Sequence, residues 1–518
     1  DTTNRYPKNG ELESHLSELF RLGREQVLVT AGGDDGLERG VRAVCSPGRE
    51  VILTNPGFEM LERYVLLSGG SVTELSWWSG EWPVDEAIAR ASSRTCAIAM
   101  VSPNNPTGSV VSAAALRRLA RTLPNVLVLL DLAYIEFADE DLTSTALELP
   151  NVVVFRTLSK AWAAAGLRVG YALGDPRVIS WLRAAGQPYP VSAPSLIAAR
   201  RLLSRAQGVG SHVERVVRQR SRVLRGLREL GLEAMDSQAN FVFARFQDAE
   251  WMLDALAGLG IGVRSFPGRP GLDAWLRITI PSEESLADRL LESVRTTLRP
   301  EALLFDLDGV LADVSRSYRL AIVRTASAFG VELGPDEIAE AKAAGNSNND
   351  WCLTQALLRR HGVEQPLSEV REVFEGLYQG ADGQCGLWKD EPLLIDRELL
   401  GGLAARYPLA IVTGRPRSDA VRFLEMHGVQ DFFAAVVTLE DGPSKPDPEP
   451  VLRALDALAV ERAWMLGDTP DDISAARSAG VLPIGVTAPA DDPRLARKGL
   501  EHASRVLRSV NEIQEILP

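Results

Sequence analysis

One lysine in the first half of the chain stands where a covalent bond to a substrate or cofactor could form. Lys160 ends the segment Arg-Thr-Leu-Ser-Lys, directly after the apolar run 152–155. A lysine at the end of a strand, with Ser159 beside it and Arg168 eight residues later, suits a Schiff base flanked by ligands for a phosphate group. A lysine that is simply solvated is the alternative for this position. We expect a helical stretch of small residues to follow Lys160.

A second group of reactive side chains lies in the second half. Asp306 and Asp308 follow the apolar run 302–305, and two carboxylates so close repel each other unless a cation lies between them. An Asx-rich turn is the alternative for this piece alone. Later strand ends and turns add a hydroxyl, a lysine and a second acidic pair, namely Thr413 with Gly414, Lys445, and Asp468 with Asp472. Together these side chains make a complete site for magnesium-dependent phosphoryl transfer.

Other residues that could contact a ligand stand at the ends of the apolar runs of the first half. They are Gly33, Asp34 and Asp35 at the start of a helix, then Phe58, Asn105, Asp131 and Tyr134. The helix start favours a phosphate, although two acidic N-cap residues fit it equally well. Asp131 follows five apolar residues, so its burial needs a partner, either a cationic ring nitrogen or a helix N-terminus. Phe58 could stack on a flat ring or fill the core.

Length and composition narrow the class of protein. With 518 residues the chain is too long for one core, and two or three domains are expected. A net charge of −13 argues against a nucleic-acid partner. The four cysteines are scattered, which indicates a reducing, cytoplasmic setting without a zinc site. We expect no signal peptide and no membrane contact, because no apolar run has membrane-spanning length.

The order of the apolar runs predicts an α/β protein. Buried strands are expected within 27–44, 50–60, 96–111 and 126–137 and at 152–155, followed mostly by helix to about 235. Short strands within 240–280 predict a smaller α+β lobe. The pattern restarts at 296–314, and Pro300 marks the boundary. We therefore expect one domain over 1–298, with its small lobe at about 1–25 and 206–298, and a second over 301–518.

The first of these domains resembles the fold-type I, pyridoxal-phosphate-dependent aminotransferases, and within them the histidinol-phosphate aminotransferase group. The resemblance rests on Arg-Tyr-Pro near the start, Ser-Pro-Asn-Asn-Pro-Thr-Gly, Asp-Leu-Ala-Tyr-Ile-Glu-Phe, the lysine segment, and the motifs around Arg264 and Arg277. It implies a mainly parallel sheet with a small α+β lobe, and pyridoxal 5'-phosphate as cofactor. The sequence departs from the family at Leu132, where an acidic residue is common, and at Trp162-Ala163, where Phe-Gly is usual. It also begins shortly before the Tyr6 motif, short of the family's N-terminal arm.

The resemblance assigns a role to each of these residues. Lys160 would form the Schiff base and serve as acid and base in proton transfer, while Asp131 would keep the pyridine nitrogen protonated. The other cofactor contacts would be Gly33, Asp34, Asp35, Phe58, Asn105, Tyr134, Thr157, Ser159 and Arg168. Tyr6 would reach the cofactor of the other subunit, which implies a homodimer. Arg264 and Arg277 would bind a substrate phosphate, because two guanidinium groups suit a dianion.

The second domain resembles the haloacid-dehalogenase superfamily, whose four motifs occur here in order. It implies a Rossmann-like fold with a helical cap at about 315–400. Asp306 would attack phosphorus to form an aspartyl phosphate, and Asp308 would protonate the leaving oxygen and then activate water, as in the phosphatases. Thr413, Gly414 and Lys445 would bind the phosphoryl group, and Mg²⁺ would be held by Asp306, Asp308, Asp468 and Asp472. Candidate selectors in the cap are Asn346, Asn348, Asn349 and Lys389, which could equally be surface residues.

The joining of the two halves predicts two consecutive steps. A keto-phosphate would take an amino group from glutamate, and the amino-phosphate would then be hydrolysed to an amino alcohol. In histidine biosynthesis these steps lead from imidazole-acetol phosphate through histidinol phosphate to histidinol. The alternatives are the same chemistry on a keto-sugar or other keto-phosphate in amino-sugar or specialised metabolism, or one half acting only as a structural or regulatory module.

Overall fold

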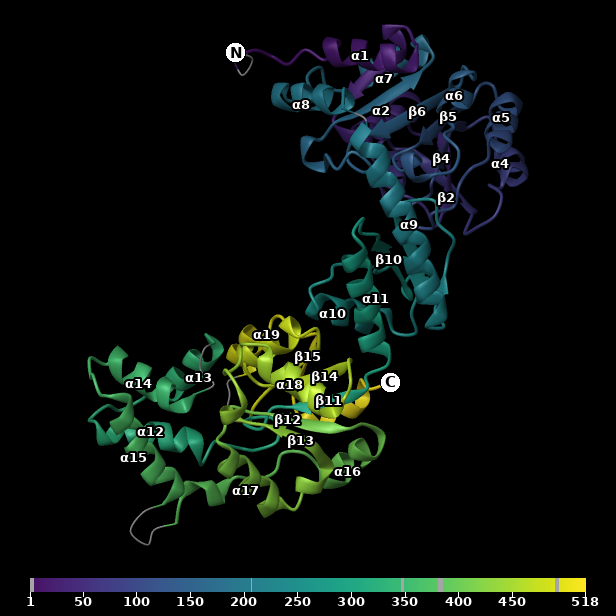
Figure 1. Ribbon diagram of the computed structural model, residues 1–518. Coiled ribbons are helices and arrows are strands. Elements are labelled where there is room, and N and C mark those ends of the chain that lie inside the picture. Colours follow the sequence, from purple (N-terminus) through teal and green to yellow (C-terminus); the bar gives the residue numbers. More distant parts are fainter. Residues whose placement is uncertain (1–3, 206, 346–348, 381–384, 490–492) are drawn as a thin grey trace. The chain divides into compact units, whose positions relative to one another are not determined.

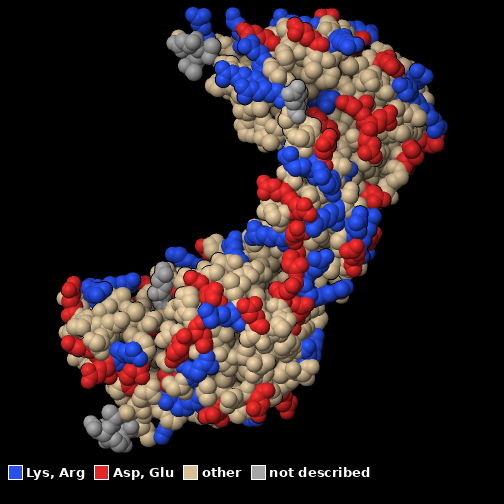
Figure 2. All heavy atoms as spheres, in the orientation of Figure 1, with Lys and Arg blue, Asp and Glu red and all other residues tan. Residues whose placement is uncertain are grey.

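The computed structural model describes residues 4–205, 207–345, 349–380, 385–489 and 493–518 (Figure 1). The chain divides into two compact units, residues 1–249 with 264–289 and residues 250–263 with 290–518. Within the described ranges, no helix is both long and apolar enough to cross a membrane. Acidic and basic side chains are interspersed over the face of the molecule in Figure 2, as expected from the mixed composition.

The first unit is built on a seven-stranded sheet in the order β1-β7-β6-β5-β4-β2-β3. The strands from β6 to β3 pair in parallel, whereas β7 runs antiparallel to β1 and β6. The strands are β1 (Val27–Thr30), β2 (Glu50–Asn55), β3 (Ser71–Ser76), β4 (Thr95–Val101), β5 (Leu127–Asp131), β6 (Val152–Thr157) and β7 (Gly170–Gly174). Because parallel strands end at the same edge, the residues after β4, β5 and β6 meet there.

Side chains along these strands alternate between two apolar cores. Val128, Leu130 and Val154 pack on one face, and Leu129 and Phe155 on the other, as the period of two in a strand requires. The helices around the sheet are α1 (Gly10–Phe20), α2 (Gly32–Val44), α3 (Glu59–Leu67), α4 (Val84–Arg90), α5 (Ala113–Thr122), α6 (Thr143–Leu147), α7 (Pro176–Ala185), α8 (Ala193–Leu203) and α9 (Gln207–Glu229). Helices α2, α3 and α7 cover the Phe155 face, and α1, α5 and α8 cover the opposite face. The sheet is therefore buried on both sides.

The structure differs from the sequence predictions at two places in this unit. The helix expected after Lys160 is wrong, since that stretch holds only a 3-10 turn at Ala165–Leu167 before β7 returns to the sheet. Ala163 and Arg168 adopt positive φ values of 51° and 53°, which a right-handed helix does not permit. In the small antiparallel sheet of β8 (Glu233–Ala234), β9 (Phe241–Arg245) and β10 (Trp275–Thr279), the expected third strand near 264 is only an isolated bridge from Arg264 to Arg277.

The second unit contains a six-stranded parallel sheet in the order β13-β12-β11-β14-β15-β16. Its strands are β11 (Ala302–Phe305), β12 (Leu409–Val412), β13 (Phe433–Val437), β14 (Ala463–Gly467), β15 (Leu482–Val486) and β16 (Arg505–Leu507). The helices beside the sheet are α16 (Arg397–Arg406), α17 (Arg417–His427), α18 (Glu449–Leu458), α19 (Pro470–Ser478) and α20 (Pro493–Gly499). The segment between β11 and α16 is helical, as predicted, with α12 (Tyr318–Ala328), α13 (Pro335–Ala343), α14 (Asp350–Arg360) and α15 (Leu367–Gln379).

Two helices that precede β11 in the sequence also pack on this sheet. They are α10 (Ala249–Gly258) and the part of α11 (Glu284–Leu298) that begins at residue 290. The rings of Trp251 and Trp464 meet edge to face with centroids 5.4 Å apart, and Trp464 Nε1 donates a hydrogen bond of 2.7 Å to the Thr296 carbonyl. Arg505 on β16 forms an ion pair of 3.1 Å with Asp254. These two helices therefore form part of the core of the second unit.

Candidate active sites

A cavity of about 570 Å³ lies at the edge of the first sheet where β4, β5 and β6 end. It brings together most of the residues predicted from the strand ends. Those that line it are Gly33, Asp34, Phe58, Asn105, Asp131, Tyr134, Thr157, Ser159, Lys160, Arg168, Arg264 and Arg277. A cavity of this size accommodates a small organic ligand.

Asp131 and Lys160 form the charged centre of this cavity. Asp131 is buried at the end of β5, and its Oδ1 accepts a hydrogen bond of 3.0 Å from the Ala133 N–H. Burial raises the pKa of Asp131 to about 7, while the charge of Lys160 acts in the opposite direction. Lys160 Nζ lies 5.2 Å from the centre of the Tyr134 ring. The carboxylate thus lacks enough positive charge nearby, and a cation in the cavity would stabilise its ionised form.

Small polar groups gather at one end of the cavity, around the start of α2. Thr157 Oγ1 donates to Ser159 Oγ at 2.9 Å, and Arg168 forms an ion pair of 3.3 Å with Asp34. Gly32 has a positive φ of 84°, and a Cβ there would come within 2.7 Å of the Arg168 guanidinium. Hydroxyl groups, an arginine and the N-terminus of a helix form a donor set for a phosphate.

Two predicted cofactor residues lie outside the cavity lining. The Asp35 carboxylate accepts hydrogen bonds of 2.8 Å from the Ala31 N–H and from Arg39 Nε, so it caps and braces α2. Tyr6 is 75% exposed and stacks on Tyr189 with ring centroids 4.7 Å apart. The hydrogen bonds of Asp35 and the ring contact of Tyr6 determine where these side chains lie, and a sequence motif does not specify such contacts.

The two predicted substrate arginines lie side by side in the same cavity, on paired backbone segments. Arg277 Nη1 donates 2.7 Å to Asn105 Oδ1, and its guanidinium lies 5.2 Å from the centre of the Phe241 ring. Arg264 forms an ion pair of 3.2 Å with Glu59. Paired guanidinium groups can bind a dianion through several parallel hydrogen bonds.

Among the cavity residues that sequence reasoning missed are Tyr64, Arg269 and Glu59. Arg269 forms an ion pair of 2.9 Å with Glu62 and lies 4.0 Å from Glu59. Burial, followed by the charge of Asp34, raises the pKa of the Tyr64 hydroxyl, so this hydroxyl stays neutral. Arg269 could have been found from its closeness to Arg264 in the sequence. Glu59 and Tyr64 lie on α3, and no sequence signal pointed to them.

The donor set fits pyridoxal 5'-phosphate. Lys160 could bind its aldehyde carbon, Asp131 is a buried carboxylate in need of a cation such as a protonated ring nitrogen, and the start of α2 with Arg168 suits its phosphate. These three features are spread over one cavity of suitable size.

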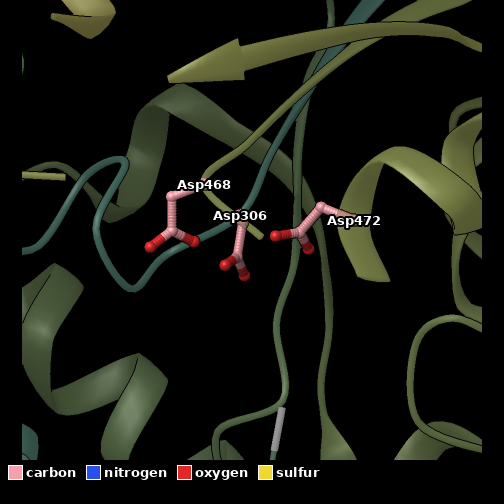
Figure 3. A group of neighbouring side chains, drawn as sticks. All are labelled: Asp306, Asp468 and Asp472. Atoms are coloured by element: carbon pink, nitrogen blue, oxygen red, sulfur yellow. The ribbon is translucent and has the colours of Figure 1, made fainter. Parts of the chain in front are cut away.

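In the second unit, three buried carboxylates converge at the ends of β11 and β14. Single ligand oxygens of Asp306, Asp468 and Asp472 all lie within 4.8 Å of one another, and Figure 3 shows the three side chains turned toward one point. Asp472 is fully buried, and its Oδ2 accepts hydrogen bonds from the Thr469 N–H and Oγ1 at 3.0 and 2.6 Å. Gly309 has a φ of 74°, and a Cβ there would collide with the Asp468 carboxylate.

Lys445 is the cation that faces these carboxylates. Its Nζ lies 2.9 Å from Asp306 Oδ1, contacts Asp472, and donates 3.0 Å to the Val412 carbonyl. Burial raises the pKa of Asp306, Lys445 opposes this shift, and Asp472 and Asp308 add to it. Thr413 is buried at the end of β12, and its Oγ1 accepts a hydrogen bond of 3.2 Å from the Arg415 N–H.

Asp308 is held by an arginine that the sequence did not single out. Arg415 Nε donates 2.5 Å to Asp308 Oδ1, and Arg415 Nη1 donates 2.7 Å to Glu391 Oε2. The Arg415 side chain is 1% exposed, and its guanidinium lies 4.7 Å from the centre of the Tyr318 ring. Arg415 follows Thr413-Gly414 directly, but its pairing with Glu391 depends on the tertiary fold.

The carboxylate cluster fits a divalent cation with oxygen ligands. Lys445 contacts two of the three buried aspartates, and carboxylate oxygens this close together are suitable ligands for Mg²⁺. Of the candidate cap residues, Asn349 lines a small cavity next to Asp308, and Lys389 Nζ lies 3.2 Å from Cys385 Sγ. Asn346 and Asn348 lie outside the described residues.

Known proteins are similar to both units. The profile of aminotransferase class I and II matches residues 1–294, and that of haloacid dehalogenase-like hydrolase matches residues 300–480. A histidinol-phosphate aminotransferase of Pectobacterium carotovorum is 35% identical over 289 residues, which cover 54% of this chain and 81% of that protein. A Phytophthora nicotianae protein named imidazoleglycerol-phosphate dehydratase is 49% identical over 197 residues, 36% of this chain but only 44% of that protein.

A solved structure supports the fold of the first unit. The histidinol-phosphate aminotransferase of Sinorhizobium meliloti, in complex with pyridoxal-5'-phosphate, has a TM-score of 0.52 and 26% identity. The match covers 57% of this chain and 84% of that chain. The predicted α/β fold class and both predicted family relationships are thereby confirmed. The chain belongs to the class I and II aminotransferases, and it also carries a haloacid dehalogenase-like hydrolase domain.

Proposed function

We propose that this protein transfers an amino group from glutamate to a keto-phosphate of the imidazole-acetol-phosphate type and then hydrolyses the resulting amino-phosphate to an amino alcohol. The observation that carries this proposal is the pair Arg264 and Arg277 in the same cavity as Lys160, on a chain that also contains the buried cluster of Asp306, Asp468 and Asp472. Relatives named for histidinol phosphate and imidazoleglycerol phosphate support an imidazole-bearing phosphate as the substrate. We assign the first step to residues 1–298 and the second to 301–518, with 315–400 as the cap.

In the first step, the residues of the cavity would bind the substrate and move one proton. Pyridoxal phosphate, when bound, supplies an electron sink for the substrate carbon that carries the nitrogen. Lys160 Nζ would remove the proton from the carbon of glutamate that carries the amino group and, after amino transfer, give a proton to the former carbonyl carbon of the keto-phosphate, while Asp131 would supply the negative charge that keeps the ring nitrogen protonated. Asn105 and Tyr134 orient the ring, while Arg264 and Arg277 bind the substrate phosphate.

In the second step, Asp306 would attack phosphorus and the bond to the leaving oxygen would break. Asp308 gives its proton to that oxygen, and then removes a proton from the water that hydrolyses the phosphate on Asp306. Thr413 and Lys445 bind the phosphoryl oxygens. A magnesium ion, when bound, would be held by Asp306, Asp468 and Asp472, with Asp308 nearby, and would neutralise charge on the phosphoryl group.

We further infer that the protein forms a homodimer through its first unit. Aminotransferases of this family typically do so, and the exposed aromatic pair of Tyr6 and Tyr189 offers apolar area for an interface. Tyr6 would then contact the cofactor site of the second copy. Light scattering of the purified protein should give twice the mass of the chain, and a monomer with full transaminase activity would contradict the inference.

The substrate can be identified with one comparative assay. The purified protein, supplied with pyridoxal phosphate and Mg²⁺, is offered glutamate with imidazole-acetol phosphate or with a keto-sugar phosphate. We expect histidinol and free phosphate from the first mixture. Turnover of the keto-sugar phosphate alone would overturn the imidazole substrate and leave the two-step chemistry intact, whereas turnover of neither would contradict the proposal.

A further inference from the structure

A small cavity lies beside Asp308, on the side of the helical cap. The core contributes Asp308, Gly414 and Arg415 to its wall, and the start of α14 contributes Asn349, Asp350 and Trp351. The residue that protonates the leaving oxygen must touch that oxygen, so the alcohol part of the substrate lies next to Asp308. The side chains of this cavity are therefore placed to contact the leaving alcohol.

The core side of the cavity contains one guanidinium and two carboxyl groups. Arg415 is shared between two carboxylates, with hydrogen bonds of 2.5 Å to Asp308 and 2.7 Å to Glu391. One guanidinium thus compensates two acidic groups. When Asp308 carries the proton that it gives to the leaving oxygen, Arg415 and Glu391 balance each other, so selection by charge falls to the cap side of the cavity.

The cap side adds a further carboxylate. The Asp350 side chain is 9% exposed, and the nearest cation is Lys342, whose Nζ lies 3.7 Å from Asp350 Oδ1, beyond hydrogen-bond distance. Burial raises the pKa of Asp350 and Asp308 adds to the shift, whereas Lys342, Arg319 and Arg415 oppose it. A hydrogen-bonded cation at this position would offset the cost of burying the carboxylate.

The neighbours of Asp350 hold it in a fixed position. Asn349 Oδ1 caps α14 by accepting hydrogen bonds of 3.1 Å from the Trp351 and Cys352 N–H groups. The Trp351 ring is fixed by an Nε1 hydrogen bond of 3.0 Å to Glu375 and by the Arg371 guanidinium 4.2 Å from its centre. Asp350 lies between these two anchored residues, so its backbone position in the cavity wall is fixed.

We propose that Asp350 is the specificity residue of the phosphatase site and binds a protonated amine on the leaving alcohol of a phosphate monoester. This inference rests on the proposed phosphatase function and names the class of its substrate, an amino-alkyl phosphate. The same chemistry is found in the amino-phosphate that transamination of a keto-phosphate yields. The competing role for Asp350 is structural, as an acidic residue at a helix N-terminus paired with Lys342.

The test compares two esters that differ only in the amine, 2-aminopropyl phosphate and propyl phosphate, on the full-length protein with Mg²⁺. Wild type should show a kcat/KM for the amine at least about tenfold higher, the effect of one charge-assisted contact. Asp350→Asn should bring this ratio close to one, mainly through a higher KM for the amine. Asp350→Glu should restore part of the ratio, and Asp336→Asn, an exposed change on the same cap, should leave it unchanged.

The outcomes separate the subsite from the phosphatase function itself. Equal rates on both esters in wild type would overturn the amine subsite but not the phosphatase. A loss of the same factor on both esters in Asp350→Asn, with their ratio kept, would assign Asp350 the structural role and overturn the proposal. If wild type released phosphate from neither ester nor from p-nitrophenyl phosphate, the phosphatase function would fall and the subsite with it.

Discussion

The two candidate active sites meet the problem of buried carboxylates in different ways. In the first unit, Asp131 and Lys160 face a cavity of about 570 Å³, and burial, to which the charge of Asp34 adds, raises the Asp131 pKa to about 7. In the second unit, Asp306 and Asp472 contact Lys445 directly, and ligand oxygens of three aspartates lie within 4.8 Å of one another. The first site therefore has room for an organic cation, while the second brings carboxylate oxygens close enough together to share one metal ion.

This difference shows how each site brings together the groups that its proposed reaction requires. The first uses few ionised groups, spaced widely, and depends on a cofactor that fills the space between them. In the second, the charged groups contact one another directly, and Arg415 holds Asp308, the proposed acid, by a hydrogen bond. Both folds thus place these residues at the carboxyl ends of parallel strands. The charged groups are far apart in the first site and close together in the second.

The largest expected effect is the separation of the two activities by single substitutions. Asp306→Asn should reduce phosphate release from a monoester by at least about 10³-fold, because it removes the nucleophile. Transamination, followed as 2-oxoglutarate formation, should be unchanged. Lys160→Ala should have the reverse effect. Loss of both activities in either variant would show that the two sites are not independent.

Removal of metal should sharpen the same contrast. On the proposed function, the aspartate cluster would use a divalent cation and the cavity of the first unit would not. A chelator should abolish phosphate release and leave transamination unaffected, and added Mg²⁺ should restore the first activity. Phosphate release that persists after exhaustive dialysis against the chelator would contradict the metal assignment.

Arg415→Lys tests whether the activity of Asp308 depends on the position in which Arg415 holds its carboxyl group. A lysine carries the charge but cannot bond Asp308 and Glu391 through one planar group, so we expect kcat of the phosphatase to fall about 10²-fold with KM little changed. The matched control is Arg417→Lys, whose half-exposed guanidinium pairs with Asp441 instead. Equal kinetics in the two variants would argue against a positioning role.

Packing contributes a smaller expected effect. Trp251→Phe reduces the area of contact with Trp464 in the core of the second unit. It should lower the free energy of unfolding of that unit by about 1 kcal/mol. Denaturant melts that follow phosphatase activity would measure this change. Trp181→Phe, at a half-exposed site of the first unit, is the control and should leave the phosphatase melt unaltered.

The smallest expected effect is a pH dependence at Asp131. Its folded pKa of about 7 exceeds its ordinary value of 3.8, so its contribution to stability is present below pH 3.8 and is lost as the pH rises toward 7. In cofactor-free protein, Asp131→Asn should therefore raise Tm more at pH 8 than at pH 5, by about 2 °C. Calorimetry checks this, and an equal shift at both pH values would contradict it.

Sequence reasoning succeeds where a strand and its last residue suffice to place a side chain. Asp131, Asp306, Thr413 and Asp468 lie at the ends of parallel strands, and the apolar runs locate these strands. Their convergence follows from sheet topology alone.

Sequence reasoning fails where contacts between segments far apart in the chain determine the position of a side chain or helix. The pairing of Arg415 with Glu391, the capping role of Asp35, and the packing of α10 on the second sheet have no local pattern. The helix expected after Lys160 fails for a different reason, since the chain turns back at Ala163, against the local preference of alanine, and β7 then pairs with β6.

The most direct test of the account is the order of the two steps on one substrate. Wild-type protein with glutamate and a keto-phosphate should form 2-oxoglutarate and phosphate in equal amounts, Asp306→Asn should form only 2-oxoglutarate, and Lys160→Ala should form neither. Release of phosphate from the keto-phosphate by Lys160→Ala, at the wild-type rate, would show that hydrolysis does not wait for the amine and would contradict the central claim.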